Sequence, residues 1–509
     1  MPSGAAPARP ADVGPKFLVR SLHVTGETRF SEAQLVAATD FKPDSELNLA
    51  DLREFAARIT SLYNQSGYFV AQAYLPAQEI KNGAVTIAVI EGHYGEIGVH
   101  NESHVSDGLI SSILAGLNSG DPVEIAPLDR RLLIISDLPG VEASSTLSPG
   151  AAVGTSDLKI NLTPGPRVTG SLEADNWGNP YTGAYRLGAT VNINNLIGYG
   201  DVLSFRTLDS TTGDMTYGRV SYQAQVQDAT VGVAFTAFRY HLEGAFADLD
   251  ASGTEEIASV YGSYPLIRSR NNNLYAVIDF DYRIFQDKIG ATSTVTDKAA
   301  SVVTIGLNGD SHDTFGGGGW NTYSVAGVFG DLDIQSSAAR QIDAATARTN
   351  GGYGKVYGSF SRLQNVIGPV SLFGWFRGQA AFQNLDISEK MELGGATGVR
   401  AYPEGEAYGD QGYIATLEAR LQLPKWPPNL PGQMQLIGFV DTGYVTLNHS
   451  PWLNGANTAV RSGVGVGLTW AETNRFLVSV GVAHRIGDPP ATSAPDRWGR
   501  VWAQVIVFF

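Results

Sequence analysis

The sequence predicts a transmembrane β-barrel of 16 antiparallel strands that follows two small α+β domains. Up to residue 165, helical and strand-like segments are mixed. After Pro166 the helical period is replaced by segments of roughly ten residues in which apolar and polar side chains alternate. The composition agrees, because 43% of the residues are hydrophobic while the mean hydropathy is only −0.06. No apolar run reaches the roughly 18 residues of a membrane helix, which leaves the barrel as the membrane architecture.

Charge and cysteine content exclude several classes of function. The chain has 35 Lys and Arg against 50 Asp and Glu, and its net charge of −15 argues against nucleic-acid binding. It has no cysteine, so disulfides, thiolate metal sites and Cys nucleophiles are excluded. Residues 1–16 are small and Pro-rich, which predicts a flexible segment without the features of a signal peptide. If the protein is exported, we expect its signal peptide to be absent from this sequence.

Residues 17–92 predict the first α+β domain. Ser31 is a suitable N-cap for one helix, and Gly67 ends a second helix in which apolar residues recur every three or four positions. The expected elements are a strand at 17–26, helices at 31–39 and 48–67, and strands at 70–76 and 84–92.

Residues 93–165 repeat the same order of elements and predict a second α+β domain. The two copies make an internal repeat of roughly 75 residues, too few copies for a solenoid. The expected elements are a strand at 95–101, a helix at 105–117, a helix that starts at Pro127 and ends before Pro139 and Gly140, and strands at 141–150 and 155–165.

Residues 166–509 predict the barrel, because their segments alternate with period two. In 276–284, apolar residues occupy the even positions, and Asp279, Asp281 and Arg283 occupy the odd ones. The two sets lie on opposite faces of the strand, so one face meets lipid and the other is wet. Connections after odd-numbered strands are mostly long and those after even-numbered strands mostly short, which places the short side in the periplasm. The 16 strands are expected to start near residues 167, 185, 201, 216, 230, 256, 273, 298, 319, 352, 369, 413, 432, 461, 475 and 500.

A soluble all-β domain is the alternative to a membrane barrel. A propeller would repeat a signature every 40 to 50 residues or so, and the sequence shows none. The even number of predicted strands instead suits a closed antiparallel barrel with both ends on one side.

A long connection at 383–412 is expected to fold back into the barrel lumen. Its glycines permit close backbone approach, and Arg400 in the middle of it needs a partner there. Asp441 is a lumenal carboxylate without a local basic neighbour, so the two residues are expected to pair. The alternative is a solvated Arg400 and a channel-lining Asp441. Glu418 and Arg420, also lumenal, either join this network or line a wet pore.

Four stretches resemble the outer-membrane transporters of two-partner secretion, of the haemolysin-activator type, within the superfamily that joins POTRA domains to a barrel. The third stretch carries Val-Arg-Ala-Tyr at 399–402, similar to the motif at the tip of that superfamily's loop between strands eleven and twelve. The four stretches, which lie within a resemblance that extends from Phe17 to Phe509, are 137–160, 175–201, 393–413 and 437–445.

The resemblance implies that the chain passes an unfolded partner exoprotein through its barrel to the cell surface. It implies two periplasmic POTRA domains and a loop-tip motif of Val399, Arg400 and Tyr402 whose arginine contacts Asp441. Two departures stand out. Ala401 replaces the usual Gly, which is expected to stiffen the turn, and residues 1–16 are too short and Pro-rich for the plug helix of such transporters.

The second POTRA domain is expected to bind the partner, because an unfolded segment can add as a strand to an exposed sheet edge. The partner class implied is a β-helical adhesin or cytolysin, the surrounding phase is outer-membrane lipid, and the transporter is expected to act as a monomer. The residues expected to line the edge and the helix beside it are Asp129, Leu133, Ser136, Val141, Ala143 and Leu147.

Other functions are less well supported by the sequence. An outer-membrane assembly factor of the same superfamily is the main alternative, although such factors usually carry three or more POTRA domains. A passive porin needs none. The sequence lacks the common hydrolase and metalloprotease motifs, so no enzymatic activity, metal or cofactor is expected. His100 and His104 are the one histidine pair with metal-ligand spacing, and they are expected to bind none.

Overall fold

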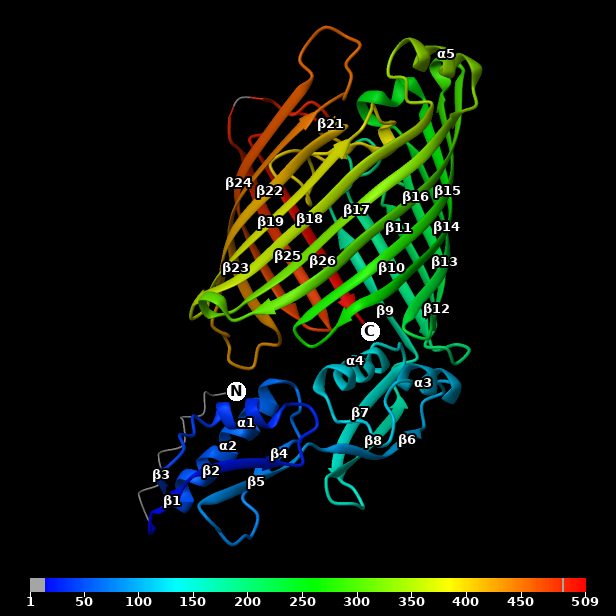
Figure 1. Cartoon of the computed structure of the whole chain (residues 1–509). Coiled ribbons are helices and arrows are strands. Elements are labelled where there is room, and N and C mark those ends of the chain that lie inside the picture. The colour runs from blue at the N-terminus through cyan, green and yellow to red at the C-terminus, as the bar shows by residue number, and fades with distance from the viewer. Residues whose placement is uncertain (1–13, 488) are drawn as a thin grey trace. The chain divides into compact units, whose positions relative to one another are not determined.

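The computed structural model describes residues 14–487 and 489–509. These form two compact units: one is built mainly from the chain up to Pro164, and the other contains Gly165–Phe509 with the short stretches His104–Leu109 and Leu138–Val141. Figure 1 shows two α+β domains followed by a barrel. The flexible segment predicted at 1–16 falls mostly on residues 1–13, outside the described residues.

The first α+β domain has a three-stranded sheet in the order β2-β5-β4, in which β2 runs parallel to β5 and β4 antiparallel to it. Both helices and the sheet share one core, with Leu35, Ile59 and Ile87 fully buried. As predicted, the first helix begins after Ser31, which forms a capping box. The elements are β1 (Phe17–Val19), β2 (Ser21–Thr25), α1 (Glu32–Ala38), β3 (Ser45–Leu47), α2 (Leu49–Gln65), β4 (Gln72–Tyr74) and β5 (Ala84–Ile90).

One small sheet of this domain was not predicted. The strand expected at 17–26 is divided at Arg20, and its first part, β1, pairs with β3. Each of these two strands has three residues. A period-two pattern needs four or more residues to be visible, so the sequence alone does not reveal the pair.

The buried carboxylate of Glu91 ties this domain together. It accepts hydrogen bonds from the backbone N–H groups of Thr28 and Arg29 at 2.6 and 2.9 Å and from the Tyr63 hydroxyl at 2.8 Å. Burial raises the pKa of the Glu91 carboxyl, but the hydrogen bonds from Thr28, Arg29 and Tyr63 outweigh it and hold the pKa below its usual value. The carboxylate therefore fixes the turn after β2 onto α2.

Glu91→Gln is expected to weaken the first domain by about 2 kcal/mol at neutral pH, because the donors lose a charged acceptor. Since folding lowers the pKa of Glu91, its contribution is complete above the pKa of the unfolded state and is lost as pH falls through the folded-state value. Hydrogen exchange of the α2 amides in the full chain measures the change. The exposed Glu54, paired with Arg58, gives the control Glu54→Gln, which should change little. Equal exchange in the two variants would contradict the role of Glu91.

The second α+β domain has the sheet order β6-β8-β7, with β6 parallel to β8. Its helices match the predicted pair; the second begins two residues before Pro127 and ends at Ser136, before Pro139 and Gly140 as predicted. Proline is tolerated there because the first turn of a helix has no internal acceptor for its N–H. The elements are β6 (His93–Asn101), α3 (Asp107–Leu114), α4 (Ile125–Ser136), β7 (Val141–Pro149) and β8 (Thr155–Pro164). None of the helices within the described residues is long and apolar enough to cross a membrane.

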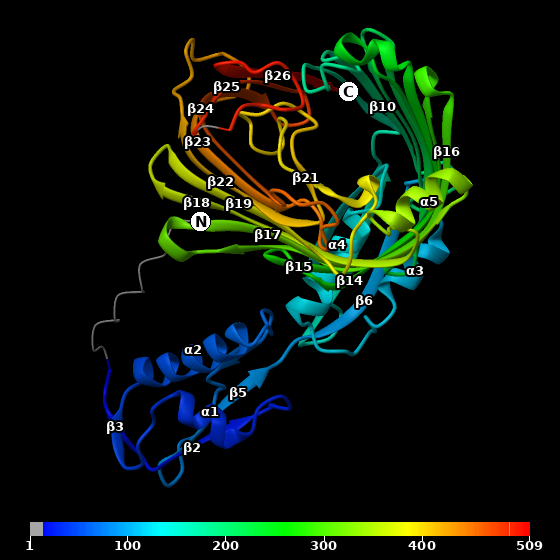
Figure 2. The ribbon, with the colours of Figure 1, turned by 90° about the horizontal axis from the view of Figure 1, so that it is seen from above.

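The barrel is a closed antiparallel sheet of 16 strands, and β26 pairs with β9 to complete it. Figure 2 shows the closed ring from above. The strands are β9 (Val168–Asp175), β10 (Arg186–Asn194), β11 (Val202–Ser210), β12 (Met215–Val226), β13 (Ala229–His241), β14 (Ala251–Arg268), β15 (Asn272–Ile289), β16 (Thr294–Asp313), β17 (Gly319–Ile334), β18 (Gly351–Ile367), β19 (Val370–Ala381), β22 (Gln411–Gln422), β23 (Gln433–Thr446), β24 (Thr458–Glu472), β25 (Phe476–Arg485) and β26 (Gly499–Phe508).

The predicted alternation and strand count are confirmed. In β15 the apolar Ile278, Phe280 and Ile284 are exposed on the outer face, while Asp281 and Arg283 form an ion pair on the inner face. Each strand begins within five residues of its predicted start. The sequence therefore determines both faces of the barrel wall.

The expectation of spanning strands of about ten residues was wrong for β14 to β18, which have 16 to 20 residues each. Their backbone pairing continues beyond the apolar band, as in the unbroken register from Asn272↔Ser311 to Ile289↔Thr294. Hydrophobic alternation reports only the part in contact with lipid, so the polar extensions look like loops in the sequence.

Candidate functional site

The connection between β19 and β22, residues 382–410, enters the barrel interior. It carries η4 (Ile387–Glu389) and a short antiparallel pair of β20 (Met391–Glu392) and β21 (Tyr408–Gly409). Figure 2 shows this segment inside the ring of strands. We call it the lumenal loop and residues 399–402 its apex.

The apex is held by an arginine–aspartate pair. The Arg400 Nε and Nη2 atoms donate to the two carboxylate oxygens of Asp441 on β23 at 2.9 and 2.8 Å, and the Arg400 backbone N–H donates at 3.1 Å. The Thr416 hydroxyl adds a fourth bond at 2.9 Å. Asp441 is fully buried. The structure thus brings together the two residues expected to pair, in the bidentate geometry that suits an arginine fork.

Glu418 and Arg420 extend this pair into a row of alternating charges. Arg400 Nη1 lies 2.8 Å from Glu418, whose other oxygen lies 2.6 Å from Arg420. The Arg400 guanidinium lies 3.4 Å from the centre of the Phe439 ring, a favourable cation–π contact. The row contains two cations and two anions, so it neutralises itself inside the lumen.

The remaining apex residues pack rather than pair. Val399 and Tyr402 are buried with Leu393 in an apolar cluster at the barrel wall. The Tyr402 hydroxyl donates to the Pro489 carbonyl oxygen at 3.0 Å. The methyl of Ala401, the departure from the usual Gly, lies where Gly463 of β24 has no side chain: a Cβ at 463 would lie 2.5 Å from it. The wall therefore has room for this particular apex.

A second anchor, at Glu406, was missed by sequence reasoning. Its fully buried carboxylate accepts from Arg461 of β24 at 2.6 and 2.9 Å. It also accepts from the backbone N–H groups of Thr492 and Ser493 at 2.8 and 2.9 Å, and from both of their hydroxyls at 3.0 Å. Glu406 thus ties the returning arm of the loop to the connection between β25 and β26.

The outgoing arm is anchored to the opposite wall. Glu389 accepts from Arg283 and Tyr353, both at 2.9 Å, and pairs with Lys355 at 2.7 Å. Asp386 pairs with Lys298 at 3.1 Å. These partners lie on β15, β16 and β18, so this arm contacts the long strands of the barrel.

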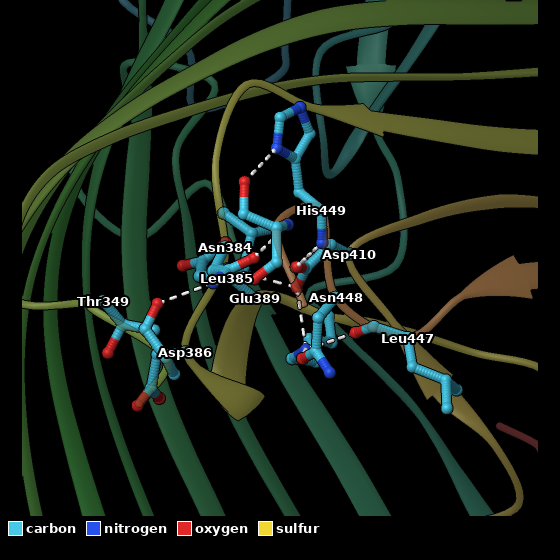
Figure 3. Close-up of polar contacts among 12 residues, drawn as sticks. Thr349, Asn384, Leu385, Asp386, Glu389, Asp410, Leu447, Asn448 and His449 are labelled. Carbon is cyan, nitrogen blue, oxygen red and sulfur yellow. Dashed lines mark hydrogen bonds and ion pairs between the residues drawn. The ribbon is translucent and has the colours of Figure 1, made fainter. Parts of the chain in front are cut away.

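Asp410 joins the two arms where the loop ends. Figure 3 shows its carboxylate between the backbone of Leu385 and that of His449, whose N–H groups donate at 3.1 and 2.7 Å. Lys390 lies 2.8 Å from the same carboxylate, which is fully buried. Like Arg400, Glu406 and Asp410 are charged residues of the connection predicted to enter the lumen and so need partners there; this is the sequence signal that could have found their contacts.

The residues expected to bind the partner lie on α4 and β7 of the second α+β domain. Asp129 and Leu133 are partly buried on α4, and Ser136 is exposed at its end. β7 occupies one edge of the β6-β8-β7 sheet, as expected. Val141, Ala143 and Leu147 of this strand are partly buried, whereas its residues 144–146 are exposed. Their role in binding stays a prediction.

The loop anchors are structural rather than chemical. Asp441, Glu406 and Asp410 accept from protein donors on both carboxylate oxygens, so none of them is free to bind a metal or to act as a nucleophile. His100 lies 3.0 Å from Glu102 through Nε2. The arrangement can hold a loop in a channel.

Comparison with protein families gives two matches. Residues 154–470 match the model of the haemolysin secretion/activation protein ShlB/FhaC/HecB, and residues 17–92 match the ShlB-type POTRA domain. The chain is 30% identical over 454 residues to the heme/hemopexin transporter protein HuxB of Haemophilus influenzae, covering 86% of this chain and 78% of that protein. It is 22% identical over 522 residues to the outer membrane transporter CdiB of Escherichia coli, covering 97% and 83%.

Solved structures share the fold. CdiB from Escherichia coli superimposes with a TM-score of 0.77 at 19% identity, covering all of this chain and 93% of that one. BamA from Haemophilus ducreyi, lacking its POTRA domains 1–3, gives a TM-score of 0.56 at 14% identity, with 97% and 100% covered. At these identities the likeness concerns the fold alone.

Proposed function

Since the chain belongs to the haemolysin secretion/activation family of ShlB, FhaC and HecB, and is an outer-membrane two-partner secretion transporter with periplasmic POTRA domains, we propose how it moves its partner. The POTRA domains bind an unfolded exoprotein, and the barrel passes it to the cell surface. The observation that carries the proposal is the lumenal loop, anchored through Arg400 inside a polar barrel. A segment that is held in the lumen by reversible ion pairs can close the conduit and can then move aside to open it.

Partner recognition is assigned to the second POTRA domain. β7 is an edge strand, so its outer backbone groups can pair with an extended segment of the exoprotein, while Leu147 and Leu133 supply apolar contacts. Such pairing selects for an unfolded chain, because a folded protein rarely offers a free strand.

The energy source in this proposal does not involve nucleotide hydrolysis by the chain. The sequence has no Walker A motif for nucleotide hydrolysis. We propose that folding of the exoprotein at the surface, into a β-helix of the adhesin or cytolysin class, makes its passage directional. The transporter acts as a monomer in this scheme, because a single chain completes the barrel by pairing β26 with β9 and so supplies a whole conduit. Light scattering of the detergent-solubilised protein tests this, and a stable dimer would contradict it.

Leu147→Asp is expected to reduce secretion of the partner exoprotein at least tenfold, because a charge at the edge opposes docking of an apolar segment. The matched control is Val153→Asp, at a fully exposed site on the turn after β7. Heat-modifiable mobility on gels verifies that both barrels insert. Normal secretion by Leu147→Asp would contradict the proposed surface. If the Leu147→Asp barrel failed to insert, the loss of secretion would be due to the failed insertion and not to the binding surface.

A further inference from the structure

We propose that the rim of the barrel carries a site for a divalent transition metal, formed by Asp214, His241 and Glu243. His241 ends β13, Asp214 directly precedes β12, and Glu243 lies two residues after His241. Both connections follow odd-numbered strands, so the site lies at the surface side of the membrane, away from the mouth where β9 begins.

The three side chains already point at one another. One ligand atom from each lies within 4.8 Å of the others. His241 Nδ1 is 3.2 Å from a Glu243 oxygen and 3.9 Å from an Asp214 oxygen. Ligands bound to a tetrahedral ion at about 2.1 Å lie about 3.4 Å apart, so the site needs only a small inward movement of Asp214.

A fourth residue, Asp250, orients the histidine. Its carboxylate lies 3.4 Å from His241 Nε2, on the far side of the ring from Glu243. A proton on Nε2 that serves Asp250 leaves the Nδ1 lone pair facing two carboxylates. A carboxylate, a histidine and a metal in line are a common arrangement, because the outer carboxylate fixes the tautomer that binds the metal.

The local charge favours a dication. Among the described residues, Asp214, Glu243 and Asp250 have no ion pair with any Lys or Arg; each pairs only with His241. Three carboxylates around one imidazole leave a net negative charge even when the ring is protonated. A divalent ion between Nδ1 and the two nearer carboxylates would neutralise it.

The backbone around the site is held firmly. The His241 N–H donates to the Asp214 carbonyl at 2.8 Å, and the Glu243 N–H donates to the Tyr181 carbonyl at 2.8 Å. Tyr181 packs edge-on against Phe246 at 4.7 Å between ring centres. A metal here would join the connections at residues 211–214 and 242–250, and the second of these is already hydrogen-bonded to the connection at 176–185.

The ligand types indicate which metal. One imidazole nitrogen with two carboxylate oxygens suits Zn²⁺ and similar ions, whereas Ca²⁺ prefers oxygen ligands alone. The His241 and Asp214 side chains are 37% and 21% exposed, so solvent can supply the remaining ligand.

The proposal can be tested by calorimetric titration of Zn²⁺ into the detergent-solubilised full chain, purified without a histidine tag. We expect one equivalent to bind, His241→Ala to abolish that binding event, and Asp214→Asn to weaken it at least tenfold. The control His312→Ala removes a histidine near the end of β16, at the other end of the barrel, that stacks on Trp320, and it should bind as the parent does. Ca²⁺ should not compete.

Two results would overturn the metal site. One is Zn²⁺ binding that is unchanged in His241→Ala, which would place the ion elsewhere. The other is no binding of Zn²⁺ by the folded parent chain. X-ray absorption at the zinc edge, recorded on the chain loaded with one equivalent of Zn²⁺, gives a second measurement: one histidine nitrogen among oxygen ligands is expected from the His241 site.

Discussion

Arg400→Ala is expected to release the apex of the lumenal loop and to leave Asp441 buried without its main partner. Removing one member of a buried ion pair costs about 3 kcal/mol or more, which shifts the docking equilibrium on the order of a hundredfold. In planar bilayers the variant should therefore open more often and conduct more. Secretion should fall at least tenfold, because a loop without its apex anchor has no fixed position in the conduit.

The control for Arg400 is Arg475→Ala, which breaks a largely exposed pair with Glu472 at a short turn. Exposed pairs contribute little, so conductance and secretion should stay at parental levels. Asp441→Ala removes the buried acceptor as well, and the double variant with Arg400→Ala should lose less than the sum of the two single variants. Strict additivity would mean that the two residues do not act through their contact.

A charge swap of Arg400 and Asp441 is a poorer test than the comparison of the two single alanine variants with the double variant. Glu418 lies 2.8 Å from Arg400 and would face an aspartate placed at 400, which repels it. The swap is therefore expected to rescue secretion only in part, even though the original pair supports secretion. The structure shows this complication, and the sequence does not, because it depends on which lumenal residue stands beside the pair.

Much of this architecture could be read from the sequence because it repeats locally. Alternation along each strand determines which side chains face lipid, and the strand starts follow from it. The Arg400–Asp441 contact could be anticipated because an isolated charge in a lumen needs a partner. The resemblance to two-partner secretion transporters indicated that this partner is Asp441. The rest depends on loop conformation: Glu406 meets Thr492 and Ser493 across 86 and 87 positions of sequence, in a connection without any periodic pattern.

The same limit explains the long strands and the small β1–β3 sheet. Polar extensions of β14 to β18 are paired through their backbones, and such pairing leaves no hydrophobic signature. The anchors of the outgoing arm lie on these strands: Arg283 and Lys355 reach Glu389 from β15 and β18. The role of Arg283 and Lys355 as anchors can be recognised only when the position of the lumenal loop inside the barrel is known.

Glu406→Ala is expected to detach the returning arm of the lumenal loop. Arg461 would be left nearly buried without its acid, and the backbone N–H groups of Thr492 and Ser493 would lose their acceptor, at a cost of about 3–5 kcal/mol. Amide exchange should accelerate both around residue 406 and in the connection between β25 and β26. Asp496→Asn, in the same connection but in a more exposed pair with Arg485, should have a much smaller effect.

Combining Glu406→Ala with Arg400→Ala distinguishes two independent anchors from one. Arg400 is held by β22 and β23, while Glu406 is held by β24 and the last long connection, so either anchor alone keeps part of the loop in the lumen. Each single variant should then retain some secretion, and the double variant should lose more than the product of the two single effects. If Arg400 were the sole anchor, Glu406→Ala would secrete normally and add nothing to Arg400→Ala. The loop would then be held at its apex alone, and the buried Glu406 carboxylate would serve only to fix the connection between β25 and β26.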